Sequence, residues 1–244
     1  MRKRPPLSFP QLLVCISLLC ALTAALTLVA SHTSPDRHFE QFTSQLFQEE
    51  MTGSTLNMHY TIADPKTFGI SEYEPVLPIY HSDQPEDSKE HCSDLLHRLD
   101  RIDPDRLSPE NAYTYRLLHR SLENDLALAD FPYYNEPLSP SSGMQSQLPV
   151  LLAEYTFRTK RDVTDYLALL DQIDDYFASL LLYEQEKAAA GFFMPACSSE
   201  KVRKQCDTIV TTEELAQGTH FLQTTFEDRL SELQKQGLFT PEET

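Results

Sequence analysis

The sequence predicts an all-α protein, in which an N-terminal signal or anchor helix precedes an irregular array of helices with one long helix (about residues 160–190). Apolar residues recur at three- and four-residue spacing along most of the chain after Ser34, which indicates amphipathic helices. No segment shows the two-residue alternation of a strand. Glycine is scarce, with 6 residues against 16 prolines, and 41% of the residues are hydrophobic. This composition excludes collagen-like and glycine-linker architectures and a wholly disordered chain.

The charge balance limits the possible partners. The 244 residues include 20 Lys and Arg against 37 Asp and Glu, a formal net charge of −17. A chain that binds nucleic acid needs a basic surface that follows the phosphates. We therefore expect no nucleic-acid partner.

The first residues have the pattern of an export signal. Arg2, Lys3 and Arg4 precede an almost wholly apolar stretch, residues 12–30, and no further charged residue occurs before Asp36. About 20 apolar residues cross a bilayer, so this stretch fits a long signal peptide or a short membrane anchor. A soluble buried helix is the third alternative.

Small residues mark a cleavage site within this pattern, with Val29 and Ser31 at the positions that a signal peptidase reads and His32 as the first residue after the cut. A cleaved chain is secreted, whereas an uncleaved one is held in the cytoplasmic membrane through residues 12–30. Both place residues 32–244 outside the cytoplasm, because the positive charges stay inside.

The helices of the first half are delimited by caps and prolines. Ser34 and Pro35 open a helix that runs to about Met51, and residues 53–88 form an irregular crossing with a helical turn around residues 56–60. A second helix begins near Ser88 and ends at Asp103-Pro104. A third runs from Ser108-Pro109 to Phe131-Pro132, and the short connection predicts a helical hairpin.

The second half begins with a proline-rich loop, residues 133–143. Residues 144–155 follow as a short apolar helix or a pair of turns interrupted at Pro149. Thr159 and Asp162 form a capping box at the start of the long helix, which Gly191 ends. Two more helices are expected, from about Ser198 and from about Thr224 to Gly237.

Three cysteines remain after the N-terminal segment, and an odd number cannot pair completely within one chain. They are Cys92, Cys197 and Cys206. A Cys197–Cys206 bridge is conceivable in an oxidising compartment. The alternative places Cys206 in the core, because it lies on an apolar helical stripe.

The last residues have the pattern of a helix start. Thr240 fits a cap and Pro241 the first helical position, with Glu242 and Glu243 in the first turn. This favours a chain that is the N-terminal part of a longer protein, with residues 32–244 an incomplete domain, and the alternative is a frayed polar tail.

No catalytic or metal-ligating residue is predicted. The chain lacks His-Glu-x-x-His, the glycine-rich phosphate loops and Gly-x-Ser-x-Gly. Glu90, Asp94 and His97 share one helical face, but such triplets are common on acidic helices and no fourth ligand is indicated.

A cleft wall is predicted at residues 143–155, where polar side chains alternate with leucines beside the proline-rich loop. The candidate cleft-lining residues are Gln145, Gln147, Glu154, Tyr155 and His59. The structural alternative is a buried connector whose polar groups satisfy the backbone of the loop.

Several segments resemble the N-terminal half of the bacterial domain-of-unknown-function 885 family. They are residues 39–51, 55–65, 136–140, 143–155 and 184–194. The resemblance implies an exported or lipid-anchored, mostly helical protein that is similar to zinc peptidases. The zinc motif of that family, His-Glu-x-x-Pro-Gly-His, belongs to its C-terminal half and is absent here, so the resemblance assigns no catalytic residue and no zinc ligand to this chain.

These observations give two hypotheses. The first is the cleft-forming N-terminal portion of an extracytoplasmic, zinc-metallopeptidase-like protein that acts on peptides, and this portion is inactive alone. The second is a membrane-tethered, non-enzymatic helical binding module that is complete at Thr244.

Overall fold

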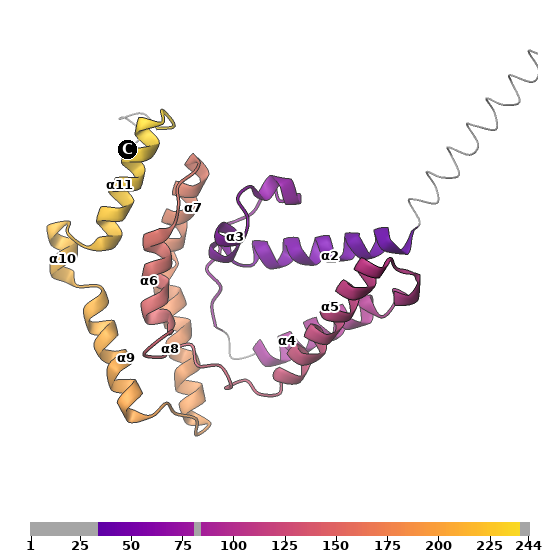
Figure 1. The fold of residues 1–244 in the computed structure, drawn as a ribbon. Coiled ribbons are helices and arrows are strands. Elements are labelled where there is room, and N and C mark those ends of the chain that lie inside the picture. The colour runs from indigo at the N-terminus through magenta and orange to yellow at the C-terminus, as the bar shows by residue number, and fades with distance from the viewer. Residues whose placement is uncertain (1–33, 81–83, 240–244) are drawn as a thin grey trace, which may run out of the picture. The chain divides into compact units, whose positions relative to one another are not determined.

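The computed structural model describes residues 34–80 and 84–239, and every regular element in these ranges is helical, which confirms the all-α prediction (Figure 1). The described residues form two compact units, residues 34–45 with 93–123 and residues 46–80 with 84–92 and 124–239. Within these ranges no helix has the length and apolar character to span a membrane. The predicted signal or anchor, the Ser31-His32 cleavage site and the helix start at Thr240 lie outside the described residues.

The first unit packs the start of helix α2 (Pro35–Thr52) against helix α5 (Pro109–Leu128). The Phe39 ring is buried and lies 6.1 Å from the ring of Tyr115. At the surface, the Asp36 carboxylate accepts hydrogen bonds of 2.8 Å from the Ser108 backbone N–H and from the Asn111 side chain. These two hydrogen bonds lower the pKa of Asp36 and connect the first turns of the two helices.

Helices α4 (Gln84–Leu99) and α5 form the predicted hairpin, joined through the short 3-10 turn η2 (Pro104–Arg106). The two helices run antiparallel, because His119 on α5 contacts Asp100 at the end of α4, while Lys89 near its start pairs with Asp130 after α5. Helix α4 begins four residues before the predicted Ser88.

In the second unit, helix α3 (Thr55–Thr61) confirms the predicted helical turn. The 3-10 turn η1 (Pro65–Phe68) follows, and residues 70–80 then continue without regular secondary structure. The backbone of this connecting segment bonds to side chains of other elements, among them Leu77 N–H to Gln172 Oε1 at 2.9 Å and Tyr80 N–H to Ser179 Oγ at 3.0 Å. Polar side chains therefore satisfy the backbone of segment 70–80, as a neighbouring strand would in a sheet.

The predicted long helix at 160–190 is wrong in one respect, because it is two helices, α7 (Lys160–Asp171) and α8 (Ile173–Ala189). The capping box of Thr159 and Asp162 is present as predicted. The break falls at Gln172, whose side chain donates to the carbonyls of Pro75 and Ala168 and accepts from Leu77 N–H. The anchoring of segment 70–80 thus accompanies the break, and no glycine or proline marks it in the sequence.

Helix α6 (Met144–Glu154) packs against helices α9 (Ala196–Ile209) and α11 (Phe221–Lys235). Of the two alternatives for this stretch, the short helix is confirmed, and Pro149 lies inside it without interrupting it. Proline removes a single helical hydrogen bond there, while its fixed φ suits a helix. Burial of α6 on two sides compensates for the lost bond.

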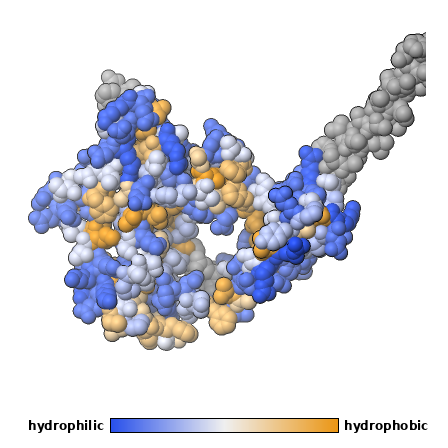
Figure 2. All heavy atoms as spheres, viewed as in Figure 1, coloured by the Kyte–Doolittle hydropathy of each residue, from blue (hydrophilic) through white to orange (hydrophobic). Residues whose placement is uncertain are grey.

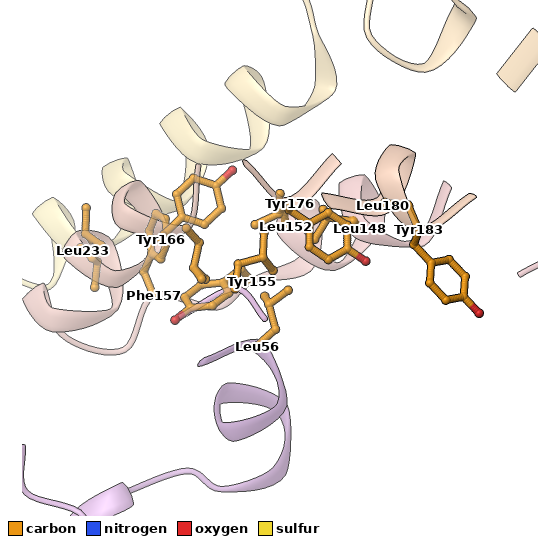
Figure 3. Packing of buried hydrophobic residues seen from close by; sticks show 13 residues of the cluster. Leu56, Leu148, Leu152, Tyr155, Phe157, Tyr166, Tyr176, Leu180, Tyr183 and Leu233 are labelled. Carbon is orange, nitrogen blue, oxygen red and sulfur yellow. The ribbon is translucent and has the colours of Figure 1, made fainter. Parts of the chain in front are cut away.

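The core of the second unit is rich in tyrosine, and Figure 3 shows how its side chains meet between α3, α6, α7 and α8. Tyr166 lies 5.6 Å from Tyr155, 5.4 Å from Phe157 and 5.6 Å from Phe226 between ring centroids. The first contact is tilted, the second is edge-on and the third is stacked, and such ring contacts stabilise the core beyond the burial of apolar area. The buried members are Leu56, Leu77, Leu148, Leu152, Tyr155, Phe157, Val163, Tyr166, Leu169, Tyr176, Leu180, Tyr183 and Leu233.

The C-terminal helices differ from the prediction in detail. Helix α10 (Thr212–Gln217) was not expected, and α11 begins at Phe221, three residues early, after His220 as its cap. Cys197 and Cys206 are both free and both exposed, so the expected bridge and the alternative core position of Cys206 are both wrong. The two cysteines lie on one helix, where nine residues of rise separate their Cα atoms by about 13 Å, too far for a disulfide.

Apolar spheres gather where α8 leads into α9 (Figure 2). Phe192 and Phe193 in this turn are 56% and 73% exposed. We call this pair the aromatic turn.

Candidate functional site

Two pockets lie on opposite sides of helix α3, in the second unit. The first, about 550 Å³, is lined mainly by apolar and aromatic side chains and is called the aromatic pocket. The second, about 590 Å³, contains charged side chains of both signs and is called the charged pocket. Leu56, Asn57 and Tyr60 of α3 line the aromatic pocket, whereas Thr55, Met58 and His59 line the charged one. The short helix is therefore the common wall.

The aromatic pocket is built from α3, segment 70–80, α6 and α8. The Tyr60 hydroxyl donates a 2.6 Å hydrogen bond to the Leu151 carbonyl, which fixes α3 against α6. Tyr80 lies 6.0 Å from Tyr176 and 5.4 Å from Tyr183 between ring centroids. Burial raises the pKa of Tyr60 and of Tyr176, so both hydroxyls keep their protons at neutral pH. The other lining residues are Ser54, Leu77, Pro78, Ile79 and Met144.

The charged pocket is organised around the buried imidazole of His59. Its ring stacks on Tyr155 with centroids 3.6 Å apart and an angle of 13° between the planes. His59 Nε2 accepts a 3.1 Å hydrogen bond from the Thr156 N–H. Burial above all, and then the charge of Arg158, lower the pKa of His59 to about 4. The imidazole is therefore neutral at pH 7 and carries its proton on Nδ1.

The start of α7 positions the residues around this imidazole. Asp162 Oδ2 accepts hydrogen bonds from the backbone N–H groups of Arg158 and Thr159 and from the Thr159 hydroxyl. Asp162 Oδ1 lies 3.7 Å from His59 Nδ1, beyond hydrogen-bond length. A carboxylate that caps the helix thus faces the pocket without forming a full bond to His59.

Arg161 has its own carboxylate partner. Asp165 is buried and accepts 2.6 Å hydrogen bonds from Arg161 Nε and from the Tyr73 hydroxyl. The guanidinium also lies 4.4 Å above the Tyr73 ring. Burial and the bond to Asp165 raise the pKa of Tyr73, which remains a neutral donor. This trio joins segment 70–80 to α7.

Two other cations line the charged pocket, Lys66 and Arg158, and neither side chain forms an ion pair among the described residues. Three carboxylates, of Asp64, Glu72 and Asp162, share the lining. Asp64 caps η1 by accepting from the Lys66 N–H. The pocket therefore offers two available cations and one carboxylate without a capping function, that of Glu72.

The structure brings together two of the five predicted cleft-lining residues, His59 and Tyr155, which stack in the charged pocket. Gln147 and Glu154 are exposed and line neither pocket beside α3. Gln145 is buried at a separate cavity of about 260 Å³. Its amide donates to the Ser139 carbonyl and to Gln205 Oε1, as the structural alternative expected.

Sequence reasoning missed Arg158, Lys66 and Tyr73 as lining residues. Arg158 immediately precedes the predicted cap Thr159, so its position at a helix start could have been noticed. Lys66 and Tyr73 lie in the irregular part of the chain, where no periodicity assigns a face. Only the tertiary contacts of this part bring the two residues to the pocket.

The residues that the structure describes do not fit a zinc site. In residues 34–80 and 84–239 no group of three or more His, Cys, Asp or Glu side chains is placed to hold a metal ion. Asp94 and His97 are exposed on α4. No chemical step of this chain is therefore assigned to a metal.

Comparison with known families shows to which family the chain belongs. The model described as "Bacterial protein of unknown function (DUF885)" matches residues 66–240, more than two thirds of the sequence. The chain belongs to the DUF885 family. Searches of curated proteins and of solved structures returned no match.

The DUF885 match contains most of the pocket walls. It includes segment 70–80, α6 to α11, and the charged residues Lys66, Arg158 and Arg161. Helix α3 and His59, which separate the two pockets, precede the matched residues. The site thus joins DUF885 elements to a short helix outside the match.

Proposed function

We propose that this DUF885 chain forms the substrate-binding wall of an extracytoplasmic, peptidase-like protein that acts on peptides. The observation that carries the proposal is the pair of pockets on the two sides of α3, one aromatic and one charged. A peptide presents both apolar side chains and charged or polar groups along one chain. Adjacent pockets of unlike chemistry are suited to such a ligand.

The aromatic pocket supports the proposal by its size and lining. Its volume of about 550 Å³ lies within the range of pockets that hold small ligands, and its walls are apolar with a few hydroxyl and amide groups. Ile79 is 37% exposed and Tyr60 is 46% exposed beside it. Exposed apolar groups in a concave site gain free energy when a ligand side chain covers them.

The proposed contribution is binding rather than hydrolysis. The resemblance to zinc peptidases implies a zinc motif that this chain does not contain, and the pocket residues supply no set of metal ligands. The export pattern of residues 1–31 supports a location outside the cytoplasm, either secreted or held in the membrane through residues 12–30.

One observation favours the alternative, a membrane-tethered interaction module without enzymatic function. The aromatic turn exposes Phe192 and Phe193 on the surface of the second unit, away from the lining of both pockets. Exposed aromatic side chains are common in protein interfaces. A partner bound there would be insensitive to changes in the pockets.

Peptide binding tests the proposal directly. Fluorescence polarisation of a labelled hexapeptide with one phenylalanine is measured with the wild-type chain, Ile79→Glu, Leu215→Glu and Phe193→Ser. Ile79→Glu puts a charge at the aromatic pocket, whereas Leu215 is 47% exposed on α10 and lines neither pocket beside α3. We expect the wild type to bind and Ile79→Glu to weaken binding about tenfold or more.

Leu215→Glu is the matched control and is expected to bind as the wild type does. Absence of binding by the wild type contradicts the proposal, as does an equal loss in both variants. Binding that is reduced only by Phe193→Ser would favour the interaction module.

A further inference from the structure

The charged pocket is lined by a hydrogen-bond donor, His59 Nδ1–H, that has no acceptor within hydrogen-bond distance among the described residues. The His59 side chain is 4% exposed, and its Nε2 is occupied by the Thr156 N–H. The neutral ring therefore carries its proton on Nδ1, and the nearest carboxylate oxygen, Asp162 Oδ1, is 3.7 Å away. This N–H is free to donate to a ligand atom that enters the pocket.

Two cations lie at the same pocket without a carboxylate partner among the described residues, Arg158 and Lys66. Arg158 acts on His59 more strongly than Asp162 does, since its charge is the larger of the two influences on the imidazole. Arg158 also directly precedes the N-terminus of α7, a helix of 12 residues, where the helix dipole is positive. Arg158 is therefore the cation that a negative ligand group beside His59 would meet, while Asp162, held by the backbone at the start of α7, limits such a group to a single charge.

The carboxylates of the lining limit how much negative charge the ligand can carry. Asp162 and Asp64 cap α7 and η1, and Arg161 is already paired with Asp165. The capping carboxylates keep their charge, so the three cations of the lining, Lys66, Arg158 and Arg161, are balanced by Asp64, Glu72 and Asp162, and of the cations only Lys66 and Arg158 lack an ion-pair partner among the described residues. A lining without excess positive charge accommodates a single carboxylate better than a doubly charged phosphate.

We propose that the charged pocket binds the C-terminal carboxylate of a peptide, with Arg158 and Lys66 as the cationic partners and His59 Nδ1–H as a neutral donor. The guanidinium of Arg158 can hold both carboxylate oxygens in its planar fork. The inference rests on the proposed peptide-binding function and adds to it the end of the peptide that is recognised.

The test compares two peptides that differ only at the C-terminus. The probe is a hexapeptide labelled at its N-terminus, made once with a free C-terminal carboxylate and once with a C-terminal amide. Dissociation constants are measured for the wild type, Arg158→Gln, Lys66→Gln and Arg203→Gln. Arg203 pairs with Asp207 on α9 and is 72% exposed, so its replacement makes the same change in net charge away from the pocket.

We expect the wild type to bind the free acid about tenfold more tightly than the amide, the effect of one charge-assisted contact. Arg158→Gln is expected to bring the two constants together, and Arg203→Gln to leave the difference intact. Unchanged circular dichroism spectra establish that the variants are folded.

The outcomes separate the two proposals. Equal binding of acid and amide by the wild type overturns carboxylate recognition and leaves peptide binding intact. A preference for the acid that persists in both Arg158→Gln and Lys66→Gln also overturns it, because the carboxylate then binds elsewhere. If neither peptide binds the wild type, both proposals fail.

Discussion

Replacing His59 by glutamine is expected to make the stability of the chain less sensitive to mild acid. In the folded state, burial and the charge of Arg158 lower the pKa of His59 from 6.5 to about 4. The unfolded chain therefore binds a proton at His59 as the pH falls below 6.5, while the folded chain does so only near pH 4. The stability that the folded chain owes to a neutral His59 is therefore fully present above pH 6.5 and is lost progressively between pH 6.5 and 4.

The magnitude follows from the difference between the two pKa values. At about 1.4 kcal/mol per pH unit, the change from 6.5 to about 4 corresponds to about 3 kcal/mol of unfolding free energy. Solvent screening reduces this free energy little, because the His59 side chain is only 4% exposed. Glu184 acts in the opposite direction, since burial raises its pKa, but it is present in both proteins and cancels in the comparison.

Glutamine is a suitable replacement because its Oε1 can accept the hydrogen bond that Thr156 N–H gives to His59 Nε2. The loss of stacking on Tyr155 lowers the stability equally at every pH. The chain has no tryptophan, so unfolding in urea is followed by circular dichroism of its helices.

The difference in unfolding free energy between the wild type and His59→Gln is expected to shrink by about 3 kcal/mol from pH 7.5 to pH 4. An independent measurement is the titration of the His59 imidazole by NMR, with a midpoint near 4. A free-energy difference that stays constant over this pH range, together with a midpoint near 6.5, would refute the buried neutral imidazole.

Other substitutions test the packing around the site. Lys187→Met is expected to lower the unfolding free energy by about 2 kcal/mol, because the buried ammonium donates to the Asn135 carbonyl and pairs with the half-exposed Glu136. Denaturation in urea measures this loss of stability. An unchanged midpoint would contradict a stabilising role of the ammonium. Gly143→Ala is expected to lower the unfolding free energy by about 1–3 kcal/mol, because the added Cβ would overlap the Ser139 backbone. Gly53→Ala is the control, since its Cβ has room. Thermal unfolding of the two variants is compared, and equal losses of stability would contradict the close packing at Gly143.

Much of the helical framework could be predicted from local signals. The capping box at Thr159 and Asp162 and the proline near the start of α2 mark these helix starts within one or two residues. These signals work because the residues that satisfy a helix end lie within one turn of it. The same reasoning missed α10, although Thr211 caps it and Gly218 ends it, because six residues show too little periodicity.

The break between α7 and α8 and the positions of the pocket residues depend on distant contacts. Gln172 is a good helix former, and its contacts with Pro75 and Leu77 bridge more than ninety positions of sequence. In the same way, His59 and Tyr155 were candidates for separate reasons, and only the fold stacks one on the other. Composition and periodicity carry no information about such pairs.

Helix α3 also acts as a spacer between the two pockets. A helix with its side chains is about 10–12 Å across, and an extended peptide advances about 3.3 Å per residue. A peptide that occupies both pockets must cross this width, which takes about three residues. Its apolar side chain then lies about three positions before the C-terminal carboxylate. Moving a single phenylalanine along an alanine hexapeptide would reveal this register as a maximum in affinity, and equal affinity at every position would exclude it.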